Sequence, residues 1–382
     1  MRRLAIGIAL LVGIVGLSAA EAQEPATIVV DAASGKVLQQ SQAAQPWYPA
    51  SLTKMMTAYV TFRALKAGRI KETSTVKISA NALGQAPSKM GFKTGTVMNV
   101  DNALKMMLVK SANDIAMAIA ETVSGNERAF VAEMNVEAKR LGMASTRYSN
   151  PNGLPAPTQV TTARDQAVLA LAIWSDFPEY RSYFGIPAIK VGKRILRSQN
   201  KLLEQYRGTT GMKTGFICSS GFNIVATARR GTRDLIAVVL GSPSSAERNE
   251  TAARLLDENF GDWLTAAKPD LATFAAAKSG AAPVDLRSLV CGKRVKSEED
   301  QPEQATGDTV TRSYLQPRFV LMDPVPVFTG RADPLPGEAA KTKPVVASQM
   351  PLPRLRPKAP AANAYAPSSS AESPTAIQVP QP

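Results

Sequence analysis

The chain has 382 residues, of which 45% are hydrophobic and 20% are charged, so it is long enough for two domains and apolar enough for a packed core. Its formal net charge of +14 suits a polyanionic partner such as cell wall, lipid headgroups or nucleic acid. It contains no histidine, which excludes every catalytic centre that depends on an imidazole base.

Residues 1–22 have the pattern of a secretory signal peptide. A basic start is followed by an apolar run over residues 4–17 and by an Ala-x-Ala sequence that ends at Ala22. The run is short for a membrane span, and an uncleaved N-terminal anchor is the alternative. We therefore expect a periplasmic or secreted protein that begins near Gln23. Export argues against nucleic acid as a partner and favours an anionic cell-wall or membrane surface.

The next part of the chain predicts a hairpin followed by helices. Short apolar runs at residues 27–31 and 36–38 flank a turn and predict a β-hairpin, which leads directly into a buried helix over residues 51–60. A later helix is expected to begin at a cap formed by Asp101 or Asn102. The remaining predicted helices span residues 113–123 and 127–141, and a further one opens at Thr162 with a capping-box-like pair and runs through Ile173.

Strand patterns return beyond residue 205. Runs at residues 211–216, 222–228 and 234–240 predict an antiparallel meander, and a last helix is predicted over residues 246–264. Strands at both ends with helices between them predict one α/β (α+β) domain, residues 23–266, whose terminal strands share an antiparallel sheet flanked by helices. Residues 267–330 are expected to form a small extension of uncertain fold, with strand-like runs at 319–322 and 325–328, and the Pro- and Ala-rich residues 331–382 a disordered tail.

The two cysteines, Cys218 and Cys291, are interpreted from the expected compartment. An oxidising environment favours a disulfide between them, with two free thiols as the alternative. Two cysteines this far apart, in a chain without histidine, do not make a zinc site. We expect no metal and no cofactor.

The segment with the strongest chemical signal is Ser51-Leu52-Thr53-Lys54. On a helix, Ser51 and Lys54 lie on one face, a turn apart, so the amine is within reach of the hydroxyl. Burial and a neighbouring cation both favour the neutral amine, which can act as a general base. Ser51 is therefore predicted to be the nucleophile and Lys54 its base.

The Ser-x-x-Lys pattern occurs twice more. Ser74 and Lys77 lie in an alternating segment that predicts a strand, where they would face opposite sides. Ser198, three residues before Lys201, is interpreted as part of a polar turn that caps a short helix. Only the copy at Ser51 stands between a Pro turn and a long apolar helix.

Two further motifs supply candidates for the rest of a site. Ser111-Ala112-Asn113 lies at a break between predicted helices, so Ser111 is a candidate proton relay and Asn113 a candidate donor to a substrate amide. The alternative is that Ser111 only caps the second helix.

Lys213-Thr214-Gly215 opens an apolar strand that has a second glycine at Gly211. Glycine at a strand edge lets a substrate backbone approach, and the ammonium of Lys213 and the hydroxyl of Thr214 suit a carboxylate. The same tripeptide at residues 93–95 lies in an irregular stretch and is interpreted as a surface loop.

The order of the three motifs resembles that of the serine penicillin-recognising enzymes. The sequences around Ser51 and Lys213, together with residues 150–154 and 162–165, are most similar to the D-alanyl-D-alanine carboxypeptidases, the low-molecular-mass penicillin-binding proteins. The resemblance covers residues 25–265 and implies a penicillin-binding/β-lactamase-like fold with a helical subdomain. It also implies a hydrolase that removes the terminal D-alanine from a peptidoglycan stem peptide ending in D-Ala-D-Ala, through an acyl-enzyme that β-lactam antibiotics trap.

The resemblance implies roles for the first two motifs. Ser51 would form the acyl-enzyme, Lys54 would be the base and Ser111 the proton relay. Asn113 would contact both the substrate and Lys54.

It implies roles for the third motif as well. Lys213 and Thr214 would bind the substrate carboxylate beside Gly215, and the backbone N–H groups of Ser51 and Phe216 would form the oxyanion hole. The positive charge of Lys213 would also help to keep the base neutral.

The sequence departs from the family pattern at two places. Ala112 stands where these carboxypeptidases usually have glycine, and apolar residues follow Gly215 where polar ones are usual. A β-lactamase is the nearest rival, but residues 150–165 offer Asp165 and no glutamate to activate a deacylating water. A catalytically weak wall-binding protein is the other alternative, and the intact motifs argue against it.

Overall fold

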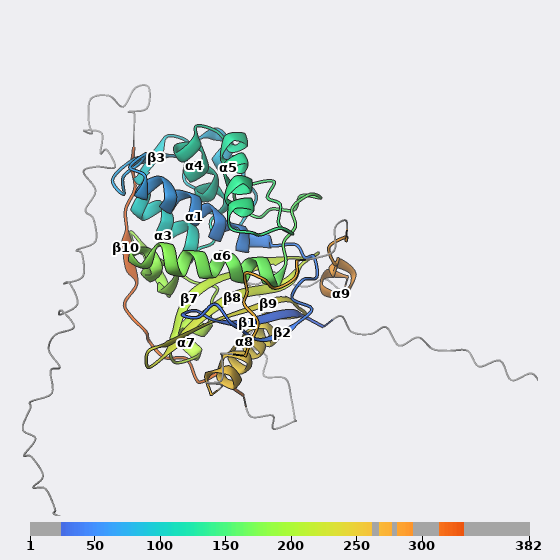
Figure 1. Cartoon of the computed structure of the whole chain (residues 1–382). Helices are drawn as coiled ribbons and strands as arrows, with labels where there is room; N and C mark the ends of the chain where they lie inside the picture. Colours follow the sequence, from blue (N-terminus) through green and yellow to red (C-terminus); the bar gives the residue numbers. More distant parts are fainter. Residues whose placement is uncertain (1–23, 262–266, 277–280, 293–312, 332–382) are drawn as a thin grey trace, which may run out of the picture. The chain divides into compact units, whose positions relative to one another are not determined.

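The computed structural model describes residues 24–261, 267–276, 281–292 and 313–331, so the predicted signal peptide and residues 332–382 lie outside the described residues. At its centre is a five-stranded sheet in the order β2-β1-β9-β8-β7, with every neighbouring pair antiparallel (Figure 1). The predicted hairpin, the meander and the pairing of early with late strands are confirmed. The strands are β1 (Ala26–Asp31), β2 (Val37–Ser41), β7 (Thr209–Ile217), β8 (Gly221–Arg230) and β9 (Arg233–Ser242).

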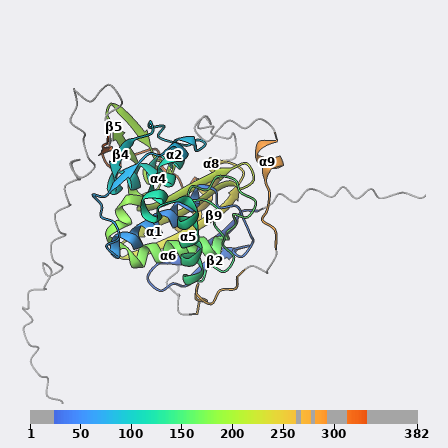
Figure 2. The same ribbon diagram turned by 90° about the horizontal axis from the view of Figure 1, so that it is seen from above.

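Helices cover both faces of this sheet, with the helical layer on one face and α8 (Ser245–Phe260) on the other (Figures 1 and 2). The strand side chains alternate between the two cores: Ile28 packs under the helical layer and Val29 packs against α8. Consecutive apolar residues in β1 are therefore explained by burial on both faces. The helical layer comprises α1 (Thr53–Lys66), α3 (Val100–Val109), α4 (Asn113–Ser124), α5 (Glu127–Arg140) and α6 (Ala163–Asp176).

The helix caps show which local signals the fold uses. Thr162 caps α6 by accepting a hydrogen bond from the Asp165 N–H, as predicted. The predicted cap of α3 is wrong, because Asn99 performs that role and its side chain accepts from the Asn102 N–H. Asp101 is instead buried, where it accepts hydrogen bonds from Lys105 and Tyr183.

Two small three-stranded sheets, β11-β4-β3 and β10-β5-β6, complete the structure. Strand β3 confirms the strand predicted around Ser74 and Lys77, although it begins at Thr75 and so contains Lys77 but not Ser74. The remaining elements are η1 (Ala50–Leu52), β3 (Thr75–Lys77), α2 (Ala80–Gly84), β4 (Thr96–Asn99), η2 (Pro178–Gly185), β5 (Ala188–Val191), β6 (Arg194–Arg197), α7 (Leu202–Gln205), α9 (Arg287–Cys291), β10 (Val325–Val327) and β11 (Gly330–Arg331).

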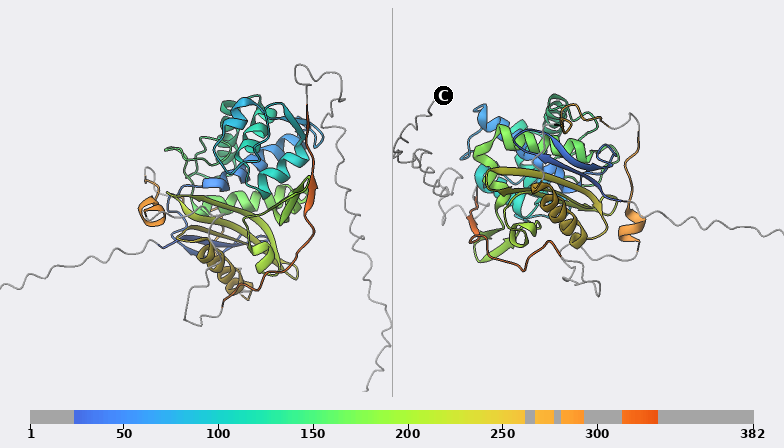
Figure 3. Two further views of the ribbon diagram at one scale, coloured as in Figure 1. Left: turned by 180° about the vertical axis from the view of Figure 1, so that it is seen from behind. Right: turned by 60° about the horizontal axis from the view of Figure 1, so that its bottom comes forward.

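The described residues after 266 pack against the elements that precede them. Leu271, Leu286 and Val327 are buried in the main core. Residues 313–331 run along one side of the molecule, where β10 pairs with β5 and β11 with β4 (Figure 3). The strand-like run at residues 319–322 does not form a strand. Within the part of the chain that the structure describes, it pairs with no strand, and the Phe319 N–H donates to the Glu204 carbonyl oxygen.

A disulfide joins Cys218, next to the end of β7, to Cys291 in α9, with the two Cα atoms 5.6 Å apart. The predicted pairing is confirmed. Among the described residues, no helix combines the length and apolar character that a membrane crossing requires.

Replacing Cys291 with serine is expected to lower the free energy of unfolding by about 2–4 kcal/mol, because the disulfide closes a long loop and restricts the unfolded chain. The two cysteines are 73 positions apart in the sequence. Urea unfolding of the variant and the wild type measures the difference. A reducing agent should bring the wild type to the stability of the variant and leave the variant unchanged, and equal stability without reductant would contradict the prediction.

Candidate active site

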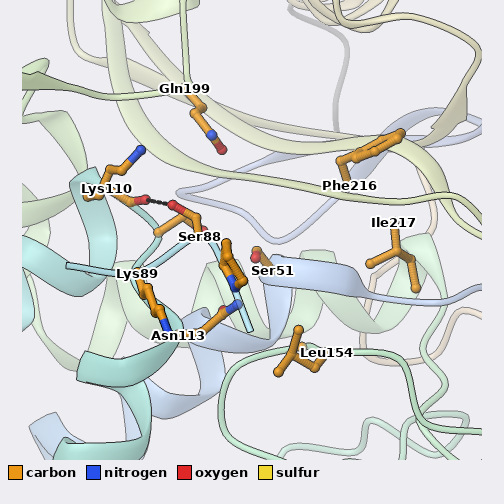
Figure 4. A pocket seen from close by; sticks show the side chains of 12 residues that line it. Ser51, Ser88, Lys89, Lys110, Asn113, Leu154, Gln199, Phe216 and Ile217 are labelled. Atoms are coloured by element: carbon orange, nitrogen blue, oxygen red, sulfur yellow. Dashed lines mark hydrogen bonds between the residues drawn. The ribbon is translucent and has the colours of Figure 1, made fainter. Parts of the chain in front are cut away.

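Ser51 lies in the single helical turn η1, which leads directly into α1. The residue before it, Ala50, has a φ of 49°, a left-handed conformation that is uncommon for a residue with a side chain. This conformation turns the chain so that partly exposed Ser51 faces a cleft (Figure 4). The first turn of α1 brings the Lys54 Nζ atom to 2.9 Å from the Ser51 Oγ atom. The predicted proximity of hydroxyl and amine is therefore present.

The Lys54 amine is fully buried and has two further oxygen neighbours. It donates to the Asn113 Oδ1 atom at 2.6 Å and to the Asn152 carbonyl oxygen at 2.6 Å. A neutral amine has only two N–H groups, so these two carbonyl-type acceptors use both. The remaining lone pair then faces the Ser51 hydroxyl, which is the geometry that a base needs to accept its proton.

The electrostatic surroundings favour this neutral form. Burial, and after it the positive charge of Lys213, hold the pKa of Lys54 well below its ordinary value, although the Asp114 carboxylate acts in the opposite direction. The effect of Lys213 was expected from the sequence. The larger contribution comes from burial, because the Lys54 side chain has no exposed surface.

The second motif lies at the predicted break between α3 and α4. Ser111 has a φ of 60°, which lets the chain turn into the cleft instead of continuing the helix. The cap of α4 is Ala112, so the alternative in which Ser111 only caps that helix is wrong. Asn113 is held from both sides of its amide, because its Oδ1 atom accepts from Lys54 and its Nδ2 atom donates to the Ala86 carbonyl oxygen at 2.8 Å.

The third motif lies on β7, close to the turn that bears Ser51. A Cβ atom at Gly215 would lie 3.0 Å from both the Pro49 carbonyl oxygen and the Ser51 nitrogen, so glycine permits this approach. Lys213 and Thr214 are buried beside the cleft and do not line it, whereas Phe216 does.

The cleft has a volume of about 320 Å³ and two chemically different walls (Figure 4). Leu154, Phe216 and Ile217 form an apolar side, and the Phe216 ring packs on Phe222 with the ring centroids 4.3 Å apart. The other lining residues are mainly polar: Ser51, Pro87, Ser88, Lys89, Lys110, Ser111, Asn113, Gly153 and Gln199.

Sequence reasoning missed several of these residues. Ser88 and Lys89 belong to a loop that reaches the cleft because the Asp114 carboxylate accepts hydrogen bonds from the Met90 and Gly91 N–H groups. Such a contact between segments far apart in sequence has no local signal.

Gln199 was also missed, because the turn that contains it was interpreted only as a cap. That cap is wrong, since α7 has no side-chain cap and Ser198 instead accepts from the Asn200 N–H inside the turn. The prediction of a polar turn is confirmed. Residues 93–95, the second copy of the Lys-Thr-Gly tripeptide, form an exposed turn, as predicted.

Comparison with known proteins agrees with this geometry. The sequence model of the D-alanyl-D-alanine carboxypeptidase family matches residues 15–244, so the chain belongs to that family. It is 38% identical over 258 residues to D-alanyl-D-alanine carboxypeptidase DacC of Escherichia coli, covering 65% of this chain and 64% of the relative. It is 33% identical over 244 residues to DacF of Bacillus subtilis, covering 62% of each. The chain thus spans slightly less than two thirds of the length of these relatives.

Solved structures confirm the fold class. Penicillin-binding protein 5 of Haemophilus influenzae is 35% identical with a TM-score of 0.60, over 62% of this chain and 70% of that protein. Penicillin-binding protein D2 of Listeria monocytogenes, solved in a cefotaxime-bound form, is 28% identical with a TM-score of 0.57, over 62% of this chain and 97% of that protein. The expected penicillin-binding fold, an antiparallel sheet flanked by helices with a helical subdomain, is therefore confirmed.

Proposed function

We propose that this protein is a serine D-Ala-D-Ala carboxypeptidase that removes the terminal D-alanine from peptidoglycan stem peptides and is acylated by β-lactam antibiotics. The observation that carries the proposal is the position of the buried Lys54 Nζ atom, 2.9 Å from the Ser51 Oγ atom and 2.6 Å from both the Asn113 Oδ1 atom and the Asn152 carbonyl oxygen. With both N–H groups of the neutral amine directed to these two carbonyl oxygens, its lone pair is available to the Ser51 hydroxyl. Membership of the carboxypeptidase family supports it. The apolar, signal-like start of the chain supports export to the cell envelope.

In the first half of the proposed reaction, the Ser51 Oγ atom attacks the carbonyl carbon of the penultimate D-alanine while Lys54 takes the hydroxyl proton. The backbone N–H groups of Ser51 and Phe216 stabilise the oxyanion. The peptide C–N bond then breaks, and the leaving amine receives a proton through Ser111. Lys213 and Thr214 hold the terminal carboxylate of the substrate.

In the second half, water attacks the acyl-enzyme ester. Lys54 accepts a proton from the water and returns it to the Ser51 Oγ atom as the ester bond breaks, so the serine hydroxyl is restored and the shortened peptide leaves with a new carboxyl group. A β-lactam follows the same first half, but its opened ring keeps the leaving nitrogen attached to the acyl group. This accounts for a long-lived adduct.

The rival β-lactamase activity requires a carboxylate that activates water against the acyl-enzyme. Asp165, the candidate from the sequence, is buried and accepts hydrogen bonds from Ser145, Thr146 and Arg164. Among the residues that the structure describes, no aspartate or glutamate lines the cleft. The geometry thus supports the carboxypeptidase.

The test is incubation of the purified protein with a diacetyl-L-Lys-D-Ala-D-Ala peptide, with free D-alanine measured over time. A parallel sample treated with penicillin is digested, and mass spectrometry locates the adduct. We expect release of D-alanine and an adduct on the peptide that contains Ser51. Rapid turnover of a chromogenic β-lactam without an adduct would support the β-lactamase, and neither product nor adduct would support the wall-binding protein.

The pH dependence of penicillin acylation should report the electrostatic interaction between the two buried lysines, Lys54 and Lys213. The rate rises with pH as Lys54 loses its proton, and the positive charge of Lys213 lowers the pKa of Lys54. Replacing Lys213 with glutamine removes that charge and stabilises the protonated amine, so the midpoint of the rise should move to higher pH. The exposed variant Lys93→Gln should keep the wild-type midpoint, and an unchanged midpoint in Lys213→Gln would contradict the prediction.

A further inference from the structure

The polar wall of the cleft carries two lysines that the proposed mechanism does not use. Lys89 lies in the loop before β4, and Lys110 is the C-terminal cap residue that follows α3. Both are half-buried and line the same cleft as Ser51. Figure 4 shows them on the side of Ser51 that lies across from Phe216 and Ile217. Lys89 and Lys110 therefore lie on a different part of the molecule from Lys213, which belongs to β7.

Backbone contacts fix the loop that carries Lys89 relative to the catalytic motifs. The Asn113 N–H donates to the Ser88 carbonyl oxygen at 2.7 Å, and the Ser88 hydroxyl donates to the Lys110 carbonyl oxygen at 3.1 Å. The Asp114 carboxylate holds the other end of the loop through Met90, at 3.0 Å. The two cations are therefore attached to the same framework that positions Asn113, and their place relative to Ser51 is set by the fold.

The charge of this wall is positive. The Lys89 ammonium donates to the Leu83 carbonyl oxygen at 3.0 Å, and an ammonium has three N–H donors. Among the described residues, the lining of the cleft includes lysines but no acidic side chain. A carboxylate placed here gains charge-assisted hydrogen bonds, whereas an ammonium is repelled.

We propose that Lys89 and Lys110 form a subsite for a second carboxylate of the substrate, at the end of the side chain that precedes D-Ala-D-Ala. This inference rests on the proposed function, which assigns the terminal carboxylate to Lys213 and Thr214. The side chains of both D-alanines are methyl groups and carry no charge. Counting back from the terminal carboxylate, the residue before them is therefore the first whose side chain can place a charge at the wall that carries Lys89 and Lys110. The preferred substrate therefore has a long, anionic side chain at that position and not a cationic one.

The test compares three acylated X-D-Ala-D-Ala peptides in which X is L-2-aminoadipate, its side-chain amide, or L-lysine. The measured quantity is the ratio of kcat/KM between the carboxylate peptide and the amide peptide. We expect a ratio of about ten in the wild type, with the lysine peptide slowest, and a ratio near one in the double variant Lys89→Gln/Lys110→Gln. Added salt should lower the wild-type ratio because it screens the half-buried charges.

Two further variants separate charge from structure. The double variant Lys89→Arg/Lys110→Arg keeps the charges and should keep a ratio well above one, and Lys93→Gln, in an exposed turn, should keep the wild-type ratio. A wild-type ratio near one, or an unchanged ratio in the glutamine double variant, would overturn the subsite while D-alanine release still supports the proposed function. Release of D-alanine from none of the three peptides would overturn both.

Discussion

Replacing Lys54 with methionine is expected to lower the rate of Ser51 acylation at neutral pH by about a hundredfold to ten-thousandfold, the range that general-base catalysis supplies. Methionine matches the length of the buried stem and keeps the site apolar, so the loss falls on the proton acceptor. Labelling by a fluorescent penicillin measures the rate of acylation, and D-alanine release from a D-Ala-D-Ala peptide measures turnover. Both should fall together, because both depend on the activated Ser51.

The matched control lies on the same helix. Lys66, in the last turn of α1, is exposed, so Lys66→Met should retain the wild-type rates. A second variant, Lys54→Arg, distinguishes a base from a fixed charge, because a guanidinium stays protonated and has no lone pair to offer. We expect Lys54→Arg to be as slow as Lys54→Met. Substantial acylation in the arginine variant would show that positive charge, and not proton acceptance, is the contribution of Lys54.

The parts of the fold that sequence predicts are those that neighbouring residues determine. Short runs of apolar residues predicted β7, β8 and β9, and the turns between them predicted the meander that joins them. The Ser51–Lys54 contact was predictable for the same reason, since a single helical turn separates the two residues and no distant segment is needed to bring them together.

The wrong predictions concern segments whose local sequence allows more than one structure, so that contacts with other parts of the chain determine the outcome. Asn99, Asp101 and Asn102 are all good cap residues, and the outcome depends on the buried contacts that Asp101 makes with Lys105 and Tyr183. The strand expected at residues 319–322 fails because a strand requires a hydrogen-bonded neighbour, which the pattern of one segment does not supply.

The candidate site likewise has parts that neighbouring residues determine and parts that depend on distant segments. Lys54 and Asn113 are named by their motifs, but the third contact of the amine is the backbone carbonyl of Asn152, and any residue type supplies a carbonyl. Lys89 reaches the cleft because hydrogen bonds from the following residues to Asp114, and from Asn113 to the preceding residue, hold its loop there. The proximity of Ser51 and Lys54 could therefore be predicted from the sequence, whereas the polar wall of the cleft required the tertiary structure.

Gly153→Ala is expected to lower the free energy of unfolding by about 3–5 kcal/mol and to slow penicillin acylation of Ser51. Gly153 has a φ of 89°, and a Cβ atom there would overlap with the carbonyl oxygen of Ala50. Ala50 already has a left-handed backbone and immediately precedes Ser51. Relief of the overlap therefore requires a shift of the turn that aims Ser51 into the cleft, so stability and activity should fall together.

Gly68→Ala separates this steric effect from the cost of the backbone conformation. Gly68 has a φ of 69°, but an added Cβ atom would meet nothing within 4 Å. Gly68→Ala should lower the free energy of unfolding by about 1 kcal/mol, because only the left-handed conformation disfavours alanine there. Urea unfolding measures both stabilities, and fluorescent penicillin labelling measures both acylation rates. If Gly153→Ala lost no more stability than Gly68→Ala and acylated at the wild-type rate, the contact between residues 153 and 50 would not be what positions Ser51.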